Sequence, residues 1–211
     1  PRRGGLARPP ALAYQAHPYR NPVIGWPADI ERLGTRDAIA FHERYYHPAN
    51  AVCVVVGDVT VEEVRRLAGI YFGRYPAGNR APELVTAEPP QAGPRRSVRF
   101  LEGARTPLVR IAFHGPRMTH PDFYALDALS LLLSEGRSAR LTRRLVEPGL
   151  AADAWAVNPD RRYAGLFVLG GTPVEPEEAR EASSSEEKRR AAYLRACEEL
   201  EERLLAEVER I

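Results

Sequence analysis

Periodic and alternating apolar positions in the first third of the chain predict a helix, a strand and a second helix. Apolar residues at helical spacing predict a helix over 35–46. The β-branched run at 51–56 predicts a strand that is buried on both faces. Thr60 and Glu63 form a capping-box pattern for a helix over 60–73. This order is typical of the end of an α+β unit.

The rest of the chain repeats strand and helix patterns in a different order. The expected elements are strands at 97–101 and 108–113, a helix begun by a cap at Thr119 and Asp122, a helix carrying Leu141 and Leu145, hairpin strands at 151–157 and 163–169, and a helix at 191–208. The acidic stretch 175–187 is interpreted as a solvated loop. Pairs of strands between helices favour an α+β fold, with an antiparallel sheet and helices packed on one face.

A proline-rich stretch separates the two parts. Five prolines and two glycines fall between Pro76 and Pro94, which is typical of an extended linker. We therefore predict three segments: 1–79 as the closing part of a first α+β unit, 80–94 as the linker, and 95–211 as the first part of a second α+β unit.

Composition argues against a nucleic-acid or membrane partner. Thirty basic residues, of which only Lys188 is a lysine, face 28 acidic ones and are scattered among them. No net field favours nucleic acid, and no apolar run approaches the length of a membrane span. Cys53 and Cys197 have no disulfide or zinc-knuckle spacing and are interpreted as buried apolar residues. Abundant arginine, alanine and proline are typical of a GC-rich bacterial genome, while the compartment stays open, with the periplasm among the alternatives.

The histidines do not have the spacing of a metal site. His42, with Glu43 beside it, and His47 share a predicted helix, but they are five residues apart and diverge by ~140° around its axis. His17, His114 and His120 lie beside prolines or at strand ends and are interpreted as turn or capping residues. We predict no metal ligand among them.

Two glycine-containing motifs also lack the pattern of a reactive centre. Gly136-Arg137-Ser138-Ala139-Arg140 fails the nucleophile-elbow pattern at its last position, where a side chain would crowd the turn. Gly170-Gly171-Thr172 lacks the lysine of a phosphate-binding loop and is interpreted as the end of a strand. We therefore predict no catalytic or cofactor-binding residue in the chain.

Several blocks together resemble the insulinase/pitrilysin/processing-peptidase family of zinc peptidases. The blocks are Ala16-His17-Pro18-Tyr19, Pro22-Val23-Ile24-Gly25, Tyr45-Tyr46-His47-Pro48-Ala49-Asn50, Val55-Val56-Gly57-Asp58, His120-Pro121-Asp122, Gly136-Arg137-Ser138-Ala139-Arg140-Leu141 and Gly149-Leu150-Ala151. Their order and spacing cover nearly the whole chain. The resemblance implies a processing-peptidase-like fold and an inactive, C-terminal-type segment.

The resemblance also implies which functional groups this segment lacks. In that family zinc is held by a His-x-x-Glu-His helix and a later Glu, and this chain contains no His-x-x-Glu-His. Zinc is therefore expected in the full-length parent and not in this segment. An Arg and a Tyr that grip the substrate backbone in the family would fall at about Val146 and Ala152, where neither residue type is present. The resemblance therefore implies either a partner chain or domain that carries this pair, or a purely structural homologue.

The expected function is that of a non-catalytic segment of a zinc metalloendopeptidase, which contributes to a chamber for polypeptide substrates and to domain or subunit contacts. The alternative is a catalytically dead scaffold subunit of the same fold, and an unrelated α+β interaction module is a third interpretation. The strand at 51–56 would lose its neighbours in this segment. It is expected to join the sheet of the second half or to pair with its copy in a homodimer, which we favour.

Overall fold

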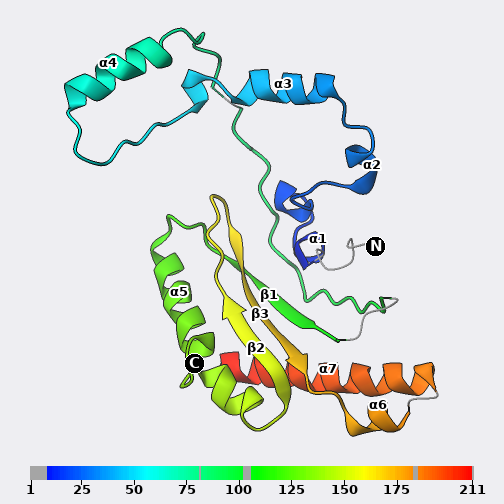
Figure 1. The fold of residues 1–211 in the computed structure, drawn as a ribbon. Coiled ribbons are helices and arrows are strands. Elements are labelled where there is room, and N and C mark those ends of the chain that lie inside the picture. The colour runs from blue at the N-terminus through cyan, green and yellow to red at the C-terminus, as the bar shows by residue number, and fades with distance from the viewer. Residues whose placement is uncertain (1–8, 81, 102–105, 183–184, 211) are drawn as a thin grey trace. The chain divides into compact units, whose positions relative to one another are not determined.

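The computed structural model describes residues 9–80, 82–101, 106–182 and 185–210, and it divides into two compact units (Figure 1). The small unit comprises residues Ala16–Pro89, and the large unit comprises Pro1–Gln15 with Pro90–Ile211. The division into segments 1–79, 80–94 and 95–211 stays a prediction about the longer protein. Residues 1–8 of the first segment lie outside the described residues.

The small unit contains the helices that the sequence predicts. Its elements are the 3-10 turns Pro18–Arg20 and Pro48–Asn50 and the helices α2 (Pro27–Ile30), α3 (Thr35–Tyr45) and α4 (Val61–Tyr71). The Thr60 side chain accepts a hydrogen bond from the N–H of Glu63 at 3.2 Å, so the predicted cap of α4 is formed. Neither α3 nor α4 has a buried residue.

The prediction of a buried strand at 51–56 is wrong for the structure of this chain. These residues form no strand, and Val52, Val54 and Val56 are 91%, 79% and 92% exposed. A strand exists only where a neighbour pairs with its backbone, and no described segment does so here. The β-branched pattern predicts a strand, but no described segment supplies the neighbouring strand that it needs.

A three-stranded antiparallel sheet forms the centre of the large unit. In order across the sheet the strands are β1 (Val109–Gly115), β3 (Gly165–Pro173) and β2 (Ala151–Val157) (Figure 1). β1 and β2 both pair with β3, which places Leu169 between Ile111 and Ala156. β2 and β3 are the predicted hairpin.

Helices pack on one face of this sheet, as predicted. The helical elements on this face are α5 (Pro121–Ser134), the π-helix Thr142–Val146 and α7 (Glu186–Glu209), with α6 (Glu177–Glu181) beside α7. The short helix α1 (Pro9–Ala13) lies beside β1, where the carbonyl oxygen of Ala13 is 3.2 Å from Nε2 of His114. The core joins Leu133 of α5, Leu145 of the π-helix and Leu200 and Leu204 of α7 to Leu169 of β3, and all five are at most 2% exposed. The architecture is α+β.

The predicted strand at 97–101 does not join the sheet. Arg96, just before it, forms ion pairs with Glu198 at 3.2 Å and Glu201 at 3.0 Å on α7. The guanidinium of Arg190 lies 5.3 Å from the ring centroid of Phe100. These contacts place the segment beside α7, and its backbone pairs with no described strand.

Three further elements differ locally from the sequence prediction. The cap of α5 is His120, whose Nδ1 accepts a hydrogen bond from the N–H of Asp122, and not Thr119. The helix expected around Leu141 and Leu145 is a π-helix over much of its length. The acidic stretch 175–187 was expected to be a loop, but it contains α6 and the start of α7, because glutamates in a first helical turn favour helix formation. Its serines at 183–184 lie outside the described residues.

Candidate functional site

The histidines that the sequence excluded as a metal site have separate structural roles. His42 stacks on Tyr46 with a ring separation of 5.1 Å, whereas His47 lies 3.1 Å through Nε2 from the carbonyl oxygen of Arg44. His17 caps the first 3-10 turn, and its Nδ1 accepts a hydrogen bond from the N–H of Tyr19. His114 lies on β1, 3.2 Å through Nε2 from the carbonyl oxygen of Ala13, so it is not a turn or capping residue.

The side chains present do not suit a resident zinc ion. Zinc needs at least three protein ligands from histidine, cysteine or carboxylate groups. Within residues 9–80, 82–101, 106–182 and 185–210, no group of three such side chains converges. The described part of the chain therefore does not fit a resident zinc ion.

The turn between the π-helix and β2 contains the family motif Gly149-Leu150-Ala151. Gly149 adopts φ +80°, a conformation that favours glycine, and its N–H donates to the carbonyl oxygen of Val146 at 3.0 Å. Val146 is half-buried and packs against the core, whereas Ala152 is exposed. The two positions that the resemblance assigns to an Arg and a Tyr therefore have different environments.

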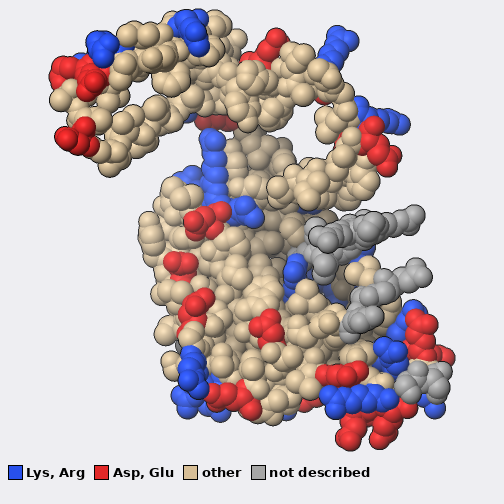
Figure 2. Space-filling view, viewed as in Figure 1, with Lys and Arg blue, Asp and Glu red and all other residues tan. Residues whose placement is uncertain are grey.

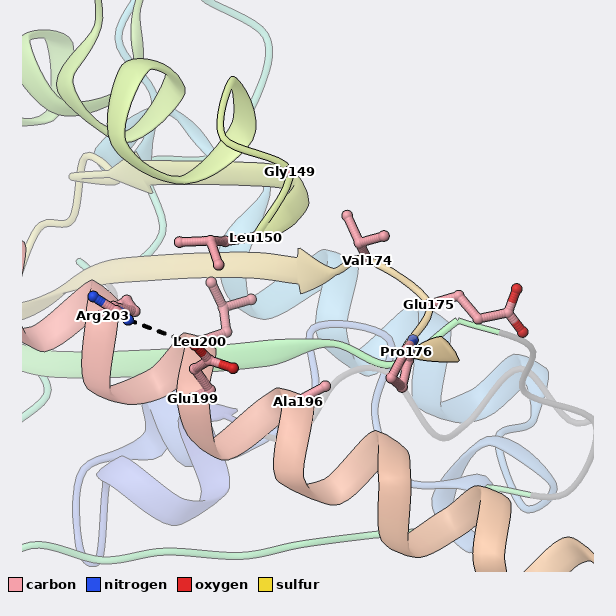
Figure 3. A pocket seen from close by; sticks show the side chains of 9 residues that line it. All are labelled: Gly149, Leu150, Val174, Glu175, Pro176, Ala196, Glu199, Leu200 and Arg203. Atoms are coloured by element: carbon pink, nitrogen blue, oxygen red, sulfur yellow. Dashed lines mark ion pairs between the residues drawn. The ribbon is translucent and has the colours of Figure 1, made fainter. Parts of the chain in front are cut away.

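A shallow cavity of about 250 Å³ opens beside this turn (Figure 3). Its lining residues come from the turn, from the chain after β3 and from α7: Gly149, Leu150, Val174, Glu175, Pro176, Ala196, Glu199, Leu200 and Arg203. Leu150 and Leu200 face each other across it, and Glu199 forms an ion pair with Arg203 at 3.6 Å. A cavity with an apolar floor and an ion pair at its rim can hold a side chain by contact. Its lining residues include no nucleophile next to a general base.

The carboxylate of Glu175 extends away from this cavity. Its oxygens accept hydrogen bonds from the Tyr193 hydroxyl at 2.9 Å and from Nε of Arg180 at 3.3 Å. The Tyr193 hydrogen bond, aided by Arg180, holds the pKa of Glu175 below its usual value. Burial, aided by the Glu175 carboxylate, raises the pKa of Tyr193. Both groups therefore keep their ordinary protonation states at neutral pH and join α7 to the chain before α6.

Glu207 is a buried carboxylate of the large unit, with a side chain only 5% exposed. It accepts a hydrogen bond from Nε of Arg140 at 2.7 Å and pairs with Arg210 at 2.6 Å. Burial acts to raise the pKa of Glu207, but the Arg140 hydrogen bond and the two guanidinium charges outweigh it and lower the pKa. This cluster fastens the Gly136–Leu141 motif to the end of α7.

Cys197 of α7 is half-buried. Burial raises the pKa of its thiol and makes it a poor nucleophile.

The sheet face opposite α5 and α7 carries a side-chain arrangement that the sequence did not predict. Arg110, Gly170 and Trp155 form one row across the three strands. A Cβ at Gly170 would lie 2.2 Å from Cζ2 of Trp155, so the indole lies across this glycine. The guanidinium of Arg110 is 5.9 Å from the indole ring centroid, within cation–π range. A strand tryptophan facing a glycine of the next strand is the signal that could have predicted it.

The charged side chains of the large unit are mixed in sign. Figure 2 shows acidic and basic side chains side by side over the region of α6 and α7. The ion pairs there include Glu178 with Arg195 and Glu186 with Arg190. None of the described helices has the length and hydropathy to cross a membrane.

Comparisons with known proteins give consistent matches. The family model described as peptidase M16 inactive domain matches residues 33–207. Zinc protease PqqE of Helicobacter pylori is 36% identical over 172 residues, which cover 79% of this chain and 39% of that protein.

Solved structures agree with this result. The crystal structure of a protease from Helicobacter pylori matches with a TM-score of 0.73 and 32% identity, over 82% of this chain and 42% of that one. A peptidase M16 inactive domain from Pseudomonas fluorescens matches with a TM-score of 0.62 over 92% of this chain and 48% of that one; at 22% identity it shows the fold alone. The chain spans two fifths to one half of the length of these relatives.

Proposed function

We propose that this chain, which belongs to the peptidase M16 inactive-domain family, is a non-catalytic segment of a longer zinc metallopeptidase and forms part of the wall of a chamber for extended polypeptides. The observation that carries the proposal is the family match over residues 33–207, together with 36% identity to a zinc protease. The catalytic metal would be held by other parts of the parent.

The architecture of the large unit supports a wall rather than a reactive centre. Its main helices cover one sheet face, and the opposite face presents Arg110 and the half-buried Trp155. Tryptophan and arginine are the residue types that contribute most to polypeptide interfaces. The outer edges of β1 and β2 have no further strand among the described residues, so an extended peptide can pair with such an edge through its backbone.

Val146 and Ala152 support the part of the proposal that concerns a partner. Because neither side chain can donate the hydrogen bonds of an Arg or a Tyr to a substrate backbone, that contribution would come from a partner chain or another domain.

Site-specific photo-crosslinking in the full-length parent tests the chamber. A photoreactive residue at Arg110, which is exposed on the sheet face opposite α7, is expected to capture a bound unfolded polypeptide. The matched control is the same group at Glu202, which is exposed on α7. Equal capture at both positions, or none at 110, would contradict the proposal. A parent that binds polypeptide but hydrolyses none with zinc present would support the scaffold alternative.

A further inference from the structure

The sheet face opposite α5 and α7 carries two neighbouring rows of side chains with different chemistry. In the first row Arg110, Gly170 and Trp155 lie side by side, and the guanidinium is 5.9 Å from the centroid of the indole ring. The next row on the same face consists of three small, half-buried apolar side chains: Ala112, Val168 and Val157. A charged and aromatic row therefore lies beside an apolar row.

These rows have the properties of a surface that stays in contact with water. Arg110 is exposed, and a permanent cover of further chain would have to bury its guanidinium, which is costly without a paired carboxylate. The apolar row is already half-buried within this chain, in contrast to the almost fully exposed valines of residues 51–56. Tryptophan and arginine are the residue types that are enriched where polypeptides bind. The face therefore suits a polypeptide that binds and leaves.

The spacing of the two rows matches that of side chains in an extended polypeptide. Successive rows on one face of a sheet are about 7 Å apart, and side chains two residues apart in an extended chain have the same separation. A polypeptide lying along the strands can therefore place one side chain over the row of Ala112 and the second next one beside Arg110. The guanidinium favours a carboxylate at this second position, because it can donate charge-assisted hydrogen bonds to it.

Asp153 is the acidic residue that the strands place on this face, in the row beyond Trp155. It lies two strands and one row away from Arg110, so sheet geometry separates their Cα atoms by about 12 Å. Exposed charges farther apart than the Debye length, ~8 Å at physiological salt, are largely screened from each other. The surface around Arg110 therefore keeps its positive character.

We propose that this face selects polypeptide segments in which an apolar and an acidic side chain are two residues apart. The apolar side chain lies over the row of Ala112, Val168 and Val157, and the carboxylate pairs with Arg110. The inference rests on the proposed function, because it names the class of polypeptide that the chamber wall selects. Trp155 supplies apolar contact to any bound segment, whereas Arg110 determines the preference for an acidic one.

Fluorescence anisotropy of the full-length parent tests this selection. Two labelled unstructured peptides are compared, which differ only in carrying glutamate or lysine two residues from a leucine, and binding is recorded by stopped flow before hydrolysis. The glutamate peptide is expected to bind about fivefold more tightly, which is the upper range for one exposed ion pair. Arg110→Glu should abolish or reverse this preference, and Arg110→Lys should retain it. Because Arg110 is exposed, both variants should keep the far-UV circular dichroism of the parent.

Two further substitutions separate the proposed contacts from general effects of charge and folding. Arg143→Glu is the matched control, because Arg143 is exposed on the π-helix, which packs on the other sheet face, and it should leave the preference unchanged. Trp155→Ala should weaken the binding of both peptides severalfold, whereas Trp155→Phe, which keeps an aromatic ring, should largely preserve it.

The possible outcomes distinguish this inference from the proposed function. Equal affinity for the two peptides would overturn the inference and leave the chamber standing. A preference that Arg110→Glu leaves intact, or that Arg143→Glu removes as well, would do the same. Unchanged affinities in Trp155→Ala would show that further chain of the parent covers this face, which would also overturn the inference. A parent that binds neither peptide would contradict the proposed function itself.

Discussion

Substituting arginine at Val146 tests the packing of the family motif, because this position and Ala152 have opposite environments in the structure. Val146 is half-buried in the π-helix and packs against the core, whereas Ala152 is exposed on β2. Fully burying a valine side chain contributes about 1.5–3 kcal/mol. Val146→Arg loses part of this contribution, and its guanidinium must reach solvent along the aliphatic stem. We therefore expect the free energy of unfolding to fall by about 2 kcal/mol.

Urea unfolding followed by near-UV circular dichroism measures this effect. Ala152→Tyr should stay within about 0.5 kcal/mol of the parent chain, because it adds a side chain at an exposed position. Glu147→Arg introduces the same side chain at the exposed neighbour of Val146 and serves as the matched control, with a similarly small effect. If Val146→Arg proves as mild as Glu147→Arg, the packing of Val146 against the core is refuted.

Two further predictions concern the Glu207 carboxylate and the sheet face that carries Trp155. Because the pKa of Glu207 is lowered in the folded state from 4.5, its ionisation stabilises the fold above about pH 4.5, and this contribution is lost as the pH falls through the folded value. Glu207→Gln should lower the free energy of unfolding by about 2 kcal/mol at pH 7. In urea titrations below pH 4.5, the difference in unfolding free energy between this variant and the unsubstituted chain should shrink. Gly170→Ala should displace the Trp155 indole and alter the tryptophan fluorescence, whereas Gly93→Ala, with nothing within 4 Å of its added Cβ, should not.

The sequence predicts the helices and the hairpin well because their signals are local. Thr60 caps α4 as its spacing with Glu63 indicates, and the alternation in 151–157 and 163–169 corresponds to β2 and β3. The family resemblance and the α+β fold with an antiparallel sheet are confirmed.

The strands that failed depend on partners that local pattern does not specify. Residues 51–56 have the composition of a central strand, but no described segment pairs with them. Residues 97–101 alternate correctly, yet the Arg96 ion pairs and the Phe100 contact place them along α7. Pairing is a tertiary property, so a pattern of two-residue period predicts only that a segment can become a strand.

For the candidate site, the sequence mainly predicts which kinds of functional centre the chain lacks. The spacing of His42 and His47 argues against a metal site, and this stays a prediction; in the structure His42 stacks on Tyr46 and His47 lies beside the carbonyl oxygen of Arg44. The row of Arg110, Gly170 and Trp155 was missed because Arg110 is 45 positions from Trp155 and 60 from Gly170 in the sequence, and the three meet only through the sheet register.

The most direct test of the central claim compares zinc content and peptide hydrolysis between the full-length parent and residues 1–211, each after chelation, zinc readdition and removal of free metal. We predict that the parent binds zinc and hydrolyses an unfolded polypeptide, whereas residues 1–211 bind no stoichiometric zinc and hydrolyse none. One zinc per chain in residues 1–211, with hydrolysis that chelation abolishes, would contradict the account.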